Sequence, residues 1–180
     1  MHFSNGVVDL PNLMTENIKN ILFFIALGKR VLILKMRVNI KKASIEDKQE
    51  VLALCRFFYN RWSPYTYQYF KNKWDGLYKQ VVVATLESRI IGYLAFRTPN
   101  SDRRFKDMLY ISDLYVLPKH REKGIGTKLV EFAERIKNER KLGRLIVNVD
   151  KNSNSIKFYN ELGFKIYKKS HKSCKLIKKD

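Results

Sequence analysis

The sequence predicts an α/β (α+β) protein in which a mixed β-sheet carries helices on both faces. Short runs rich in β-branched and aromatic residues alternate with segments whose apolar residues recur at helical spacing. Their order is a strand, two helices, a three-strand meander, a helix, a strand, a helix and two strands, without an internal repeat. The 180 residues, 45% hydrophobic and 29% charged, suit one domain with a real core and exclude a disordered chain.

The first half of this pattern holds a strand, two helices and a hairpin. Ser44 and Asp47 form a capping-box pattern before the first helix, and Pro64 suits the first position of the second. Glu87-Ser88-Arg89 is expected to join the hairpin strands. The expected strands are residues 36–43, 80–86 and 90–97, and the helical stripes are Val51, Cys55, Phe58 and Trp62, then Tyr67, Phe70, Trp74 and Leu77.

The second half begins with a strand over residues 108–116, which Pro118 closes. A helix follows, with Ile125, Leu129 and Ile136 on its apolar face. Ser153 or Asn154 is expected to cap a short helix that ends at Gly163. The remaining expected strands are residues 145–149, 164–167 and 173–177.

A glycine loop between the 108–116 strand and its helix is the most informative stretch. The first N–H groups of a helix lack internal partners, and its dipole adds positive charge there. Gly124 and Gly126 allow close approach to the main chain, and Arg121, Lys123 and Lys128 add charge, so the loop suits a phosphate or pyrophosphate. Neither a dinucleotide fingerprint nor a P-loop fits this spacing. The alternative is a plain polar turn.

Two longer motifs carry a family resemblance. The stretch DLYVLPKHREKGIG, residues 113–126, resembles the acyl-CoA-binding motif of the GCN5-related N-acetyltransferase (GNAT) superfamily, Arg/Gln-x-x-Gly-x-Gly/Ala after a strand ending in Val-x-Pro. The stretch NSNSIKFYNELGF, residues 152–164, resembles the second signature of that superfamily. The resemblance covers residues 36–180, implies a mostly antiparallel GNAT-type sheet, and leaves residues 1–35 as an N-terminal extension.

The resemblance implies acetyl-CoA as co-substrate, with no metal. The main chain of Leu114, Tyr115 and Val116 is then expected to pair with the pantetheine arm, and Asn152 to lie near it. The expected pyrophosphate site is Arg121, Glu122, Lys123, Gly124, Ile125, Gly126 and Thr127.

Tyr159 matches the position of the general acid in the superfamily and also borders the expected coenzyme site. Its hydroxyl could protonate the leaving thiolate, and the alternative is a tyrosine that only packs against the coenzyme. Some relatives carry a glutamate base where this chain has Asn148, which cannot act as a base. Asp113 and Asp150 are the candidate bases, and a water chain without a dedicated base is equally consistent.

The implied activity is an acetyl-CoA-dependent N-acetyltransferase that moves an acetyl group to a primary amine by direct attack through a tetrahedral intermediate. The acceptor could be a small molecule, a peptide N-terminus or a lysine. Aromatic residues of the two early helices could line its cleft, with Tyr65 and Tyr69 the strongest candidates. The alternative reading of those aromatics is a packed core.

The net charge of +19 allows a nucleic acid, an anionic surface or an acidic ligand as partner. The tail from Lys165 to Lys179 is rich in lysine. A competing function is therefore a basic nucleic-acid-associated binding module on the same fold without turnover, which we do not favour. A homodimer is common in the superfamily, and the sequence does not decide it.

Cys55 and Cys174 are too few for a disulfide framework and lack zinc-site spacing, so we expect a reducing, cytoplasmic setting. The apolar run over residues 21–27 is too short to span a bilayer, which needs about 20 residues. Residues 1–35 are consistent with a helix and strand that pack on the domain, an interfacial anchor, or a segment upstream of a natural start near Met36.

Overall fold

The computed structural model describes residues 21–27, 30–59, 64–99 and 106–179. The chain divides into two compact units, Met1–Arg37 and Val38–Asp180. In the first unit, β1 (Ile21–Leu27) pairs antiparallel with β2 (Arg30–Met36). Both apolar runs are therefore strands, and the helix expected in one interpretation of this segment is not formed by residues 21–27. Their bulky and β-branched side chains suit strands.

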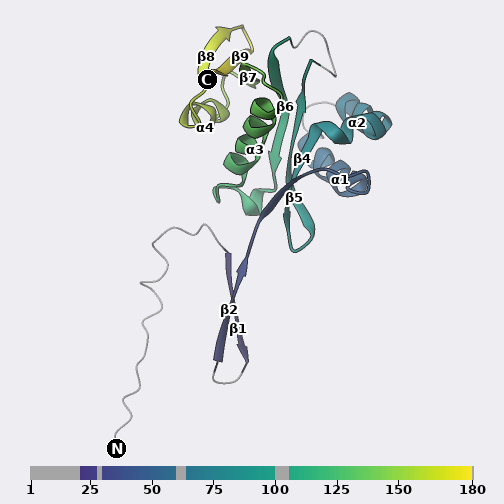
Figure 1. The fold of residues 1–180 in the computed structure, drawn as a ribbon, viewed down its shortest axis with the longest axis vertical. Coiled ribbons are helices and arrows are strands. Elements are labelled where there is room, and N and C mark those ends of the chain that lie inside the picture. Colours follow the sequence, from purple (N-terminus) through teal and green to yellow (C-terminus); the bar gives the residue numbers. More distant parts are fainter. Residues whose placement is uncertain (1–20, 28–29, 60–63, 100–105, 180) are drawn as a thin grey trace, which may run out of the picture. The chain divides into compact units, whose positions relative to one another are not determined.

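The second unit is built on one seven-stranded sheet (Figure 1). Its strand order is β3-β4-β5-β6-β7-β9-β8, and β6–β7 is the single parallel pair among these neighbours. This mixed, mostly antiparallel sheet confirms the predicted fold class. The strands are β3 (Asn39–Lys42), β4 (Val81–Leu86), β5 (Arg89–Arg97), β6 (Met108–Val116), β7 (Arg144–Asp150), β8 (Lys165–Lys169) and β9 (Ser173–Lys179).

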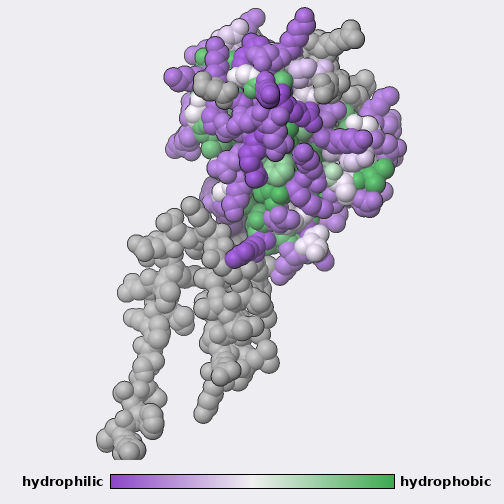
Figure 2. Space-filling view, in the orientation of Figure 1, coloured by the Kyte–Doolittle hydropathy of each residue, from purple (hydrophilic) through white to green (hydrophobic). Residues whose placement is uncertain are grey.

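Helices cover both faces of the sheet (Figure 1). On one side, α1 and α2 enclose a core that includes Cys55, Trp74, Tyr93 and Tyr115. On the other side, α3 packs along the strands from β3 to β7, with Leu129 and other apolar residues fully buried. The helices are α1 (Lys48–Tyr59), α2 (Pro64–Leu77), α3 (Ile125–Glu139) and α4 (Ser155–Glu161), with 3₁₀ turns η2 (Tyr78–Gln80) and η4 (Pro118–His120). Hydrophilic residues dominate the surface seen in Figure 2.

Several boundaries differ from the sequence-based expectation. The strand expected over residues 36–43 is shorter, because Met36 ends β2 and β3 begins at Asn39. Helix α1 begins at Lys48, so Ser44 lies a turn before the helix. The Asp47 carboxylate still accepts the N–H of Ser44 at 2.8 Å, which is one half of the predicted capping box. Trp62 lies outside the described residues.

The β4–β5 turn is tighter than expected. Glu87 and Ser88 have φ values of 49° and 65°, and Arg89 already pairs with Leu86. Two successive residues with positive φ are typical of the primed turns whose twist matches that of the flanking strands. The hairpin therefore closes with two residues rather than three.

A β-bulge at Ser112 determines which way the end of β6 faces. Phe96 pairs with Ile111 and Ala95 pairs with Asp113, so Ser112 is the extra residue. Directly paired residues share a face of the sheet. Asp113 therefore lies on the same face as Ala95, which belongs to the core beneath α1 and α2. Without the bulge, strand alternation would place Asp113 on the face of α3.

Gly92 allows β5 and β6 to approach closely at the end of β6. A Cβ atom at Gly92 would lie 2.8 Å from the carbonyl oxygen of Tyr115 and 3.2 Å from a methyl group of Val116. The first contact is shorter than real Cβ atoms show and is to backbone, and the second would require the Val116 side chain to shift by a few tenths of an ångström. We expect Gly92→Ala to lower the free energy of unfolding by about 1–3 kcal/mol, measured by urea denaturation.

Gly76 in α2 provides the matched control, since a Cβ there would meet nothing within 4 Å. Gly76→Ala is expected to raise the free energy of unfolding by up to about 1 kcal/mol, because alanine is the better helix former. Destabilisation of similar size in both variants would contradict the role assigned to Gly92.

Candidate active site

A split in the sheet creates the candidate active site. The parallel pairing of β6 with β7 runs from Met108–Arg144 to Ile111–Val147 and then stops. Beyond it, the ends of the two strands line a cavity of about 360 Å³. Its walls are Ile111 to Leu114 of β6, Val147 to Asp150 of β7, and Ser153, Ser155, Phe158 and Tyr159 at α4. The ionisable side chains in this lining are Asp113, Asp150 and Tyr159.

Helix α4 carries Tyr159 into this cavity. The helix has seven residues, so caps at its ends matter. At its start, the Ser153 hydroxyl accepts the N–H of Ser155 at 3.0 Å. At its end, Gly163 adopts a φ of 87°, and the N–H of Phe164 donates to the Tyr159 carbonyl at 3.0 Å. Of the two predicted caps, Asn154 directly precedes the helix without a side-chain cap bond, and Ser153 accepts the hydrogen bond from the helix start. The predicted glycine stop is present.

The Tyr159 side chain is buried, with 3% of its surface exposed. Its ring packs edge-on against Phe158 and Phe164, at centroid distances of 5.0 and 5.2 Å. Burial raises the pKa of Tyr159 well above the usual value, and the negative charge of Asp113 raises the pKa further. The phenol therefore keeps its proton at neutral pH and is available as a proton donor.

Asp113 lines the same cavity as Tyr159, and the bulge at Ser112 puts it on the face of the sheet that carries Ala95. Its charge also raises the pKa of Tyr110 and of Cys55, although burial is the larger cause for both groups. Of the three strand residues expected beside the pantetheine arm, Leu114 lines the cavity. Tyr115 and Val116 are buried at the end of the strand and lie outside this lining.

The glycine loop leads into the N-terminus of α3, as predicted. Glu122 and Gly124 have φ values of 59° and 71°, and the first helical hydrogen bond runs from the N–H of Lys128 to the Gly124 carbonyl at 3.0 Å. A Cβ at Gly124 would meet nothing, whereas a Cβ at Gly126 would lie 3.3 Å from the Phe158 ring. Gly126 therefore lets α4 approach α3, and Gly124 leaves the helix start open.

Two basic residues of this loop bond to carbonyl groups. The Arg121 Nε donates to the Val116 carbonyl at 2.9 Å, and its guanidinium lies 5.5 Å from the Tyr115 ring centroid. The Lys123 Nζ donates to the Lys119 carbonyl at 3.0 Å. Arg121 thus links the expected pyrophosphate loop to the expected pantetheine strand. Ile125 is buried at the helix start, and Thr127 is half-buried.

Asn152 is exposed and does not belong to the cavity lining. Its N–H donates to the Asp150 Oδ1 at 2.8 Å, which forms the turn after β7. The expected position beside the pantetheine arm stays a prediction for this residue. Ser153 and Ser155 of the same segment line the cavity instead.

The sequence-based site omitted Ser112, Ser155 and Phe158, which line the cavity. No local signal marks a bulge at Ser112. Phe158 could have been found, because it precedes Tyr159 on a short helix and faces a glycine of the loop. The side chains of Tyr65 and Tyr69, expected at the acceptor cleft, lie outside the described residues.

The two cysteines form no disulfide with each other. Cys55 and Cys174 are both buried, and burial raises the pKa of the Cys55 thiol to about 12.

The described residues offer neither a metal site nor a membrane-spanning helix. Within the described ranges, His, Cys, Asp and Glu side chains form no group of three that could hold a metal ion. No helix in the described part is long and apolar enough to cross a membrane.

Residues 49–164 match the sequence profile of the Acetyltransferase (GNAT) family. This match spans most of the chain, so the protein belongs to the GNAT acetyltransferase family, as the two motifs predicted.

Solved structures share the fold. The PaiA N-acetyltransferase of Thermoplasma acidophilum, solved with coenzyme A, is 20% identical and superimposes with a TM-score of 0.68 over 81% of this chain and all of its own. The ribosomal-protein-alanine N-acetyltransferase of Brucella melitensis is 21% identical, with a TM-score of 0.63 over 79% of this chain and 99% of its own. A putative streptothricin acetyltransferase of Bacillus anthracis, solved with acetyl coenzyme A, is 21% identical, with a TM-score of 0.50 over 56% of this chain and 61% of its own.

Proposed function

We propose that this protein transfers the acetyl group of acetyl-CoA to a primary amine in the cavity between β6 and β7. The observation that carries the proposal is a buried Tyr159 in a split of the sheet, beside the open N-terminus of α3. Membership of the GNAT family supports acetyl transfer, and two of the structural neighbours were solved with coenzyme A or acetyl coenzyme A. The residue roles below are part of the proposal.

The glycine loop fits a pyrophosphate. The N–H groups at the start of α3 need partners, and nothing occupies the space above Gly124. The exposed loop residues Arg121 and Lys123 can add charge-assisted hydrogen bonds to phosphate oxygens. The pantetheine arm would then run from this loop along β6, whose cavity-lining end has no neighbouring β7 strand to pair with beyond Ile111. We assign the main chain of Leu114, Tyr115 and Val116 to this contact.

Tyr159 is assigned as the general acid. When the amine nitrogen attacks the thioester carbon, a C–N bond forms and the C–S bond then breaks, which leaves a thiolate. The phenol keeps its proton at neutral pH and can donate it to that sulfur as the C–S bond breaks. Its raised pKa makes it a weaker acid than an ordinary tyrosine, so the transfer relies on the position of the hydroxyl in the cavity. Ser153, Phe158 and Phe164 hold α4 and the Tyr159 ring in place.

The amine must lose a proton before it can attack. Deprotonation at neutral pH costs about 4.6 kcal/mol for a lysine side chain and about 1.4 kcal/mol for an α-amine. Asp113 is our first choice for the proton acceptor, since it lies in the cavity on the face opposite α3. Asp150 also lines the cavity, but its Oδ1 already accepts the N–H of Asn152. The acidic walls favour a cationic ammonium group in a protein whose net charge is +19.

Substitution of Gly124 tests the coenzyme site. A Trp side chain at this position would cover the first N–H groups of α3, so we expect Gly124→Trp to weaken acetyl-CoA binding by about a hundredfold or more in calorimetry. Gly76→Trp places the same side chain at another open glycine and should leave the dissociation constant unchanged. Equal binding by Gly124→Trp and wild type would rule out the pyrophosphate site assigned here.

Removal of the Tyr159 hydroxyl tests the general acid. Tyr159→Phe keeps the ring that packs on Phe158 and Phe164, and we expect kcat to fall by about 10²–10⁴-fold. The dissociation constant of acetyl-CoA, measured by calorimetry, should change little. A weaker coenzyme affinity with an unchanged kcat would mean that Tyr159 only packs against the coenzyme.

Substitution of Asp113 tests its role as the base. Burial and the charge of Asp113 raise the pKa of Tyr159 above the pH range of enzyme assays, so the phenol stays protonated and should give no alkaline limb in the wild type or in Asp113→Asn. If Asp113 is the base, kcat/KM falls throughout the pH profile of Asp113→Asn. Asp75→Asn, on the exposed face of α2, is the control and should leave kcat/KM unchanged.

A loss of activity with rising pH that disappears in Tyr159→Phe would show that the phenol titrates within the assay range and would contradict its raised pKa. An unchanged kcat/KM would remove Asp113 as the base and leave Asp150 or a water chain.

A further inference from the structure

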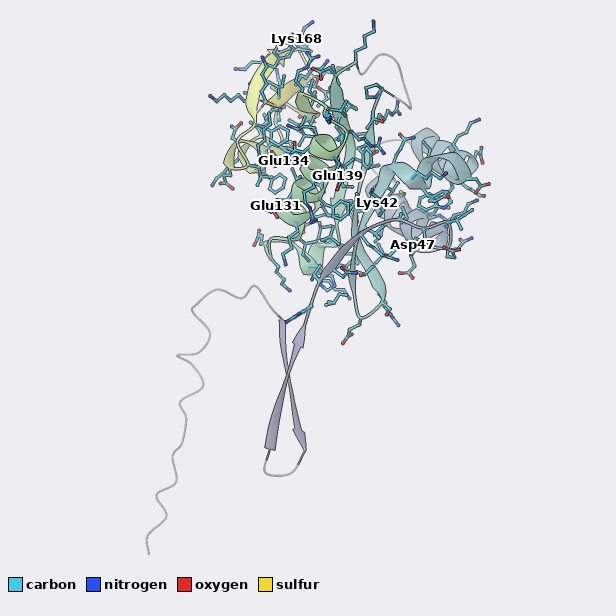
Figure 3. All side chains as sticks on the ribbon, viewed as in Figure 1. Lys42, Asp47, Glu131, Glu134, Glu139 and Lys168 are labelled. Carbon is cyan, nitrogen blue, oxygen red and sulfur yellow. The ribbon has the colours of Figure 1, made fainter. Side chains whose placement is uncertain are left out.

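Two lysines on β8 and β9 form a row that leads toward the cavity. Asn148 of β7 pairs directly with Lys175 of β9, and Lys175 pairs directly with Lys168 of β8. Directly paired residues place their side chains on the same face, roughly 5 Å apart. Asn148 itself lines the cavity. We call Lys168 and Lys175 the lysine row. Figure 3 labels Lys168 at the β8–β9 end of the molecule.

The strand register also shows which face the row occupies. Lys175 shares a face with Asn148 and, by alternation along β7, with Ile146. Ile146 pairs with Tyr110, which shares the face of Asp113 because their partners on β5 are Arg97 and Ala95. The lysine row therefore lies on the same face as Asp113. This is the face opposite α3, and the proposed coenzyme loop leads into α3.

The positive charge of the row is not neutralised within the described part of the chain. No ion pair of Lys168 or Lys175 is formed among the described residues, whereas Lys178 on the other face pairs with Glu134 at 2.7 Å. Like charges directly opposite each other destabilise a sheet. An anion bound between Lys168 and Lys175 would remove this repulsion.

An exposed aromatic residue lies beside the row. Tyr167 is the extra residue of a bulge in β8, between the pairs formed by Ile166 and Lys168, and 66% of its surface is exposed. Lys165 and Lys169 on the same strand are exposed as well. A basic strip with an exposed aromatic ring is the combination that binds single-stranded nucleic acid, since phosphates pair with lysine and bases stack on the ring. The carboxylates of an acidic peptide could meet the lysines, but they offer no planar base to stack on Tyr167.

We propose that the lysine row and Tyr167 bind the phosphate backbone and a base of a nucleic-acid strand that carries the acceptor amine. The strand would cross β8 and β9 toward Asn148, and its amine would enter the cavity beside Asp113. This inference rests on the proposed acetyl transfer and specifies its acceptor. The reaction is unchanged: the amine nitrogen gains the acetyl group, the sulfur leaves with a proton from Tyr159, and the amine proton passes to Asp113 or water.

The test uses the full chain and a short oligouridylate that carries a terminal alkylamine. Binding is followed by fluorescence anisotropy over a range of salt concentrations, and transfer by the rate of acetylation relative to the same alkylamine without RNA. We expect Lys168→Glu with Lys175→Glu to weaken binding by about tenfold or more. The loss of two phosphate contacts should lower the slope of log K against log salt by about 1.4. The kcat/KM advantage of the RNA-borne amine should disappear, and the free amine should react as before.

Two control variants test whether binding depends on the lysine row itself or only on the net charge of the protein. Lys71→Glu with Lys73→Glu removes the same charge from exposed positions on α2 and should keep most of the binding. Lys168→Arg with Lys175→Arg should retain both binding and transfer. An equal loss of binding in the α2 variant would overturn the proposal, as would a higher kcat/KM for the same amine carried on an oligoglutamate.

Failure of the proposed acetyl transfer can be distinguished from failure of phosphate binding by the lysine row. If acetyl-CoA binds and no variant acetylates either amine, the proposed reaction is wrong, and the assignment of the acceptor is wrong with it. Phosphate binding by the lysine row is decided separately by the anisotropy data, which need no turnover.

Discussion

The site depends on the point where the hydrogen-bond ladder between β6 and β7 stops. The two strands pair in parallel over four residue pairs and then separate, so the ends of both strands have lost one neighbour. Backbone polar groups that lose a partner in a protein interior must find another, in a ligand or in water. The cavity, the free edge of β6 beyond Ile111, and the position of Tyr159 all follow from this interruption. The helices on both faces keep the strands in place around it.

A single extra residue in β6 decides which face of the sheet carries the carboxylate of the site. The bulge at Ser112 turns Asp113 away from α3, so the carboxylate and the glycine loop belong to different faces of the sheet. In the proposed function, one face would hold the anionic coenzyme at the start of α3, and the other would present the carboxylate to a cationic amine. Burial raises the pKa of the Tyr159 phenol, and the negative charge of Asp113 raises it further.

Much of this architecture can be read from the sequence. The apolar periodicity from Ile125 to Ile136 predicts α3, and the glycines before it predict the open helix start, because both signals are local. The two motifs predict the family and the position of Tyr159. The bulge at Ser112 could not be predicted, since it depends on how β6 aligns with β5. The same holds for the end of the β6–β7 ladder.

Other errors have local physical causes. The carboxylate of Asp47 accepts the N–H of Ser44, and α1 still begins only at Lys48, since a capping pattern does not determine the first helical residue. The motif position of Asn152 predicts a place near the pantetheine arm, and this stays a prediction. In the structure its N–H donates to Asp150 in an exposed turn outside the cavity lining, a local hydrogen bond that the motif does not reveal.

The shortness of α4 has a consequence for how the enzyme would lose activity. A helix of seven residues is not stable by itself, so its order depends on its caps and on neighbouring elements. Such segments open locally at a smaller free energy than the core strands. A substitution at Gly163, whose φ of 87° suits glycine, would raise the population of molecules with α4 unfolded while the sheet stays intact. Heat or mutation would then abolish the proton donation proposed for Tyr159 below the melting temperature of the domain, and amide exchange in α4 would report that transition first.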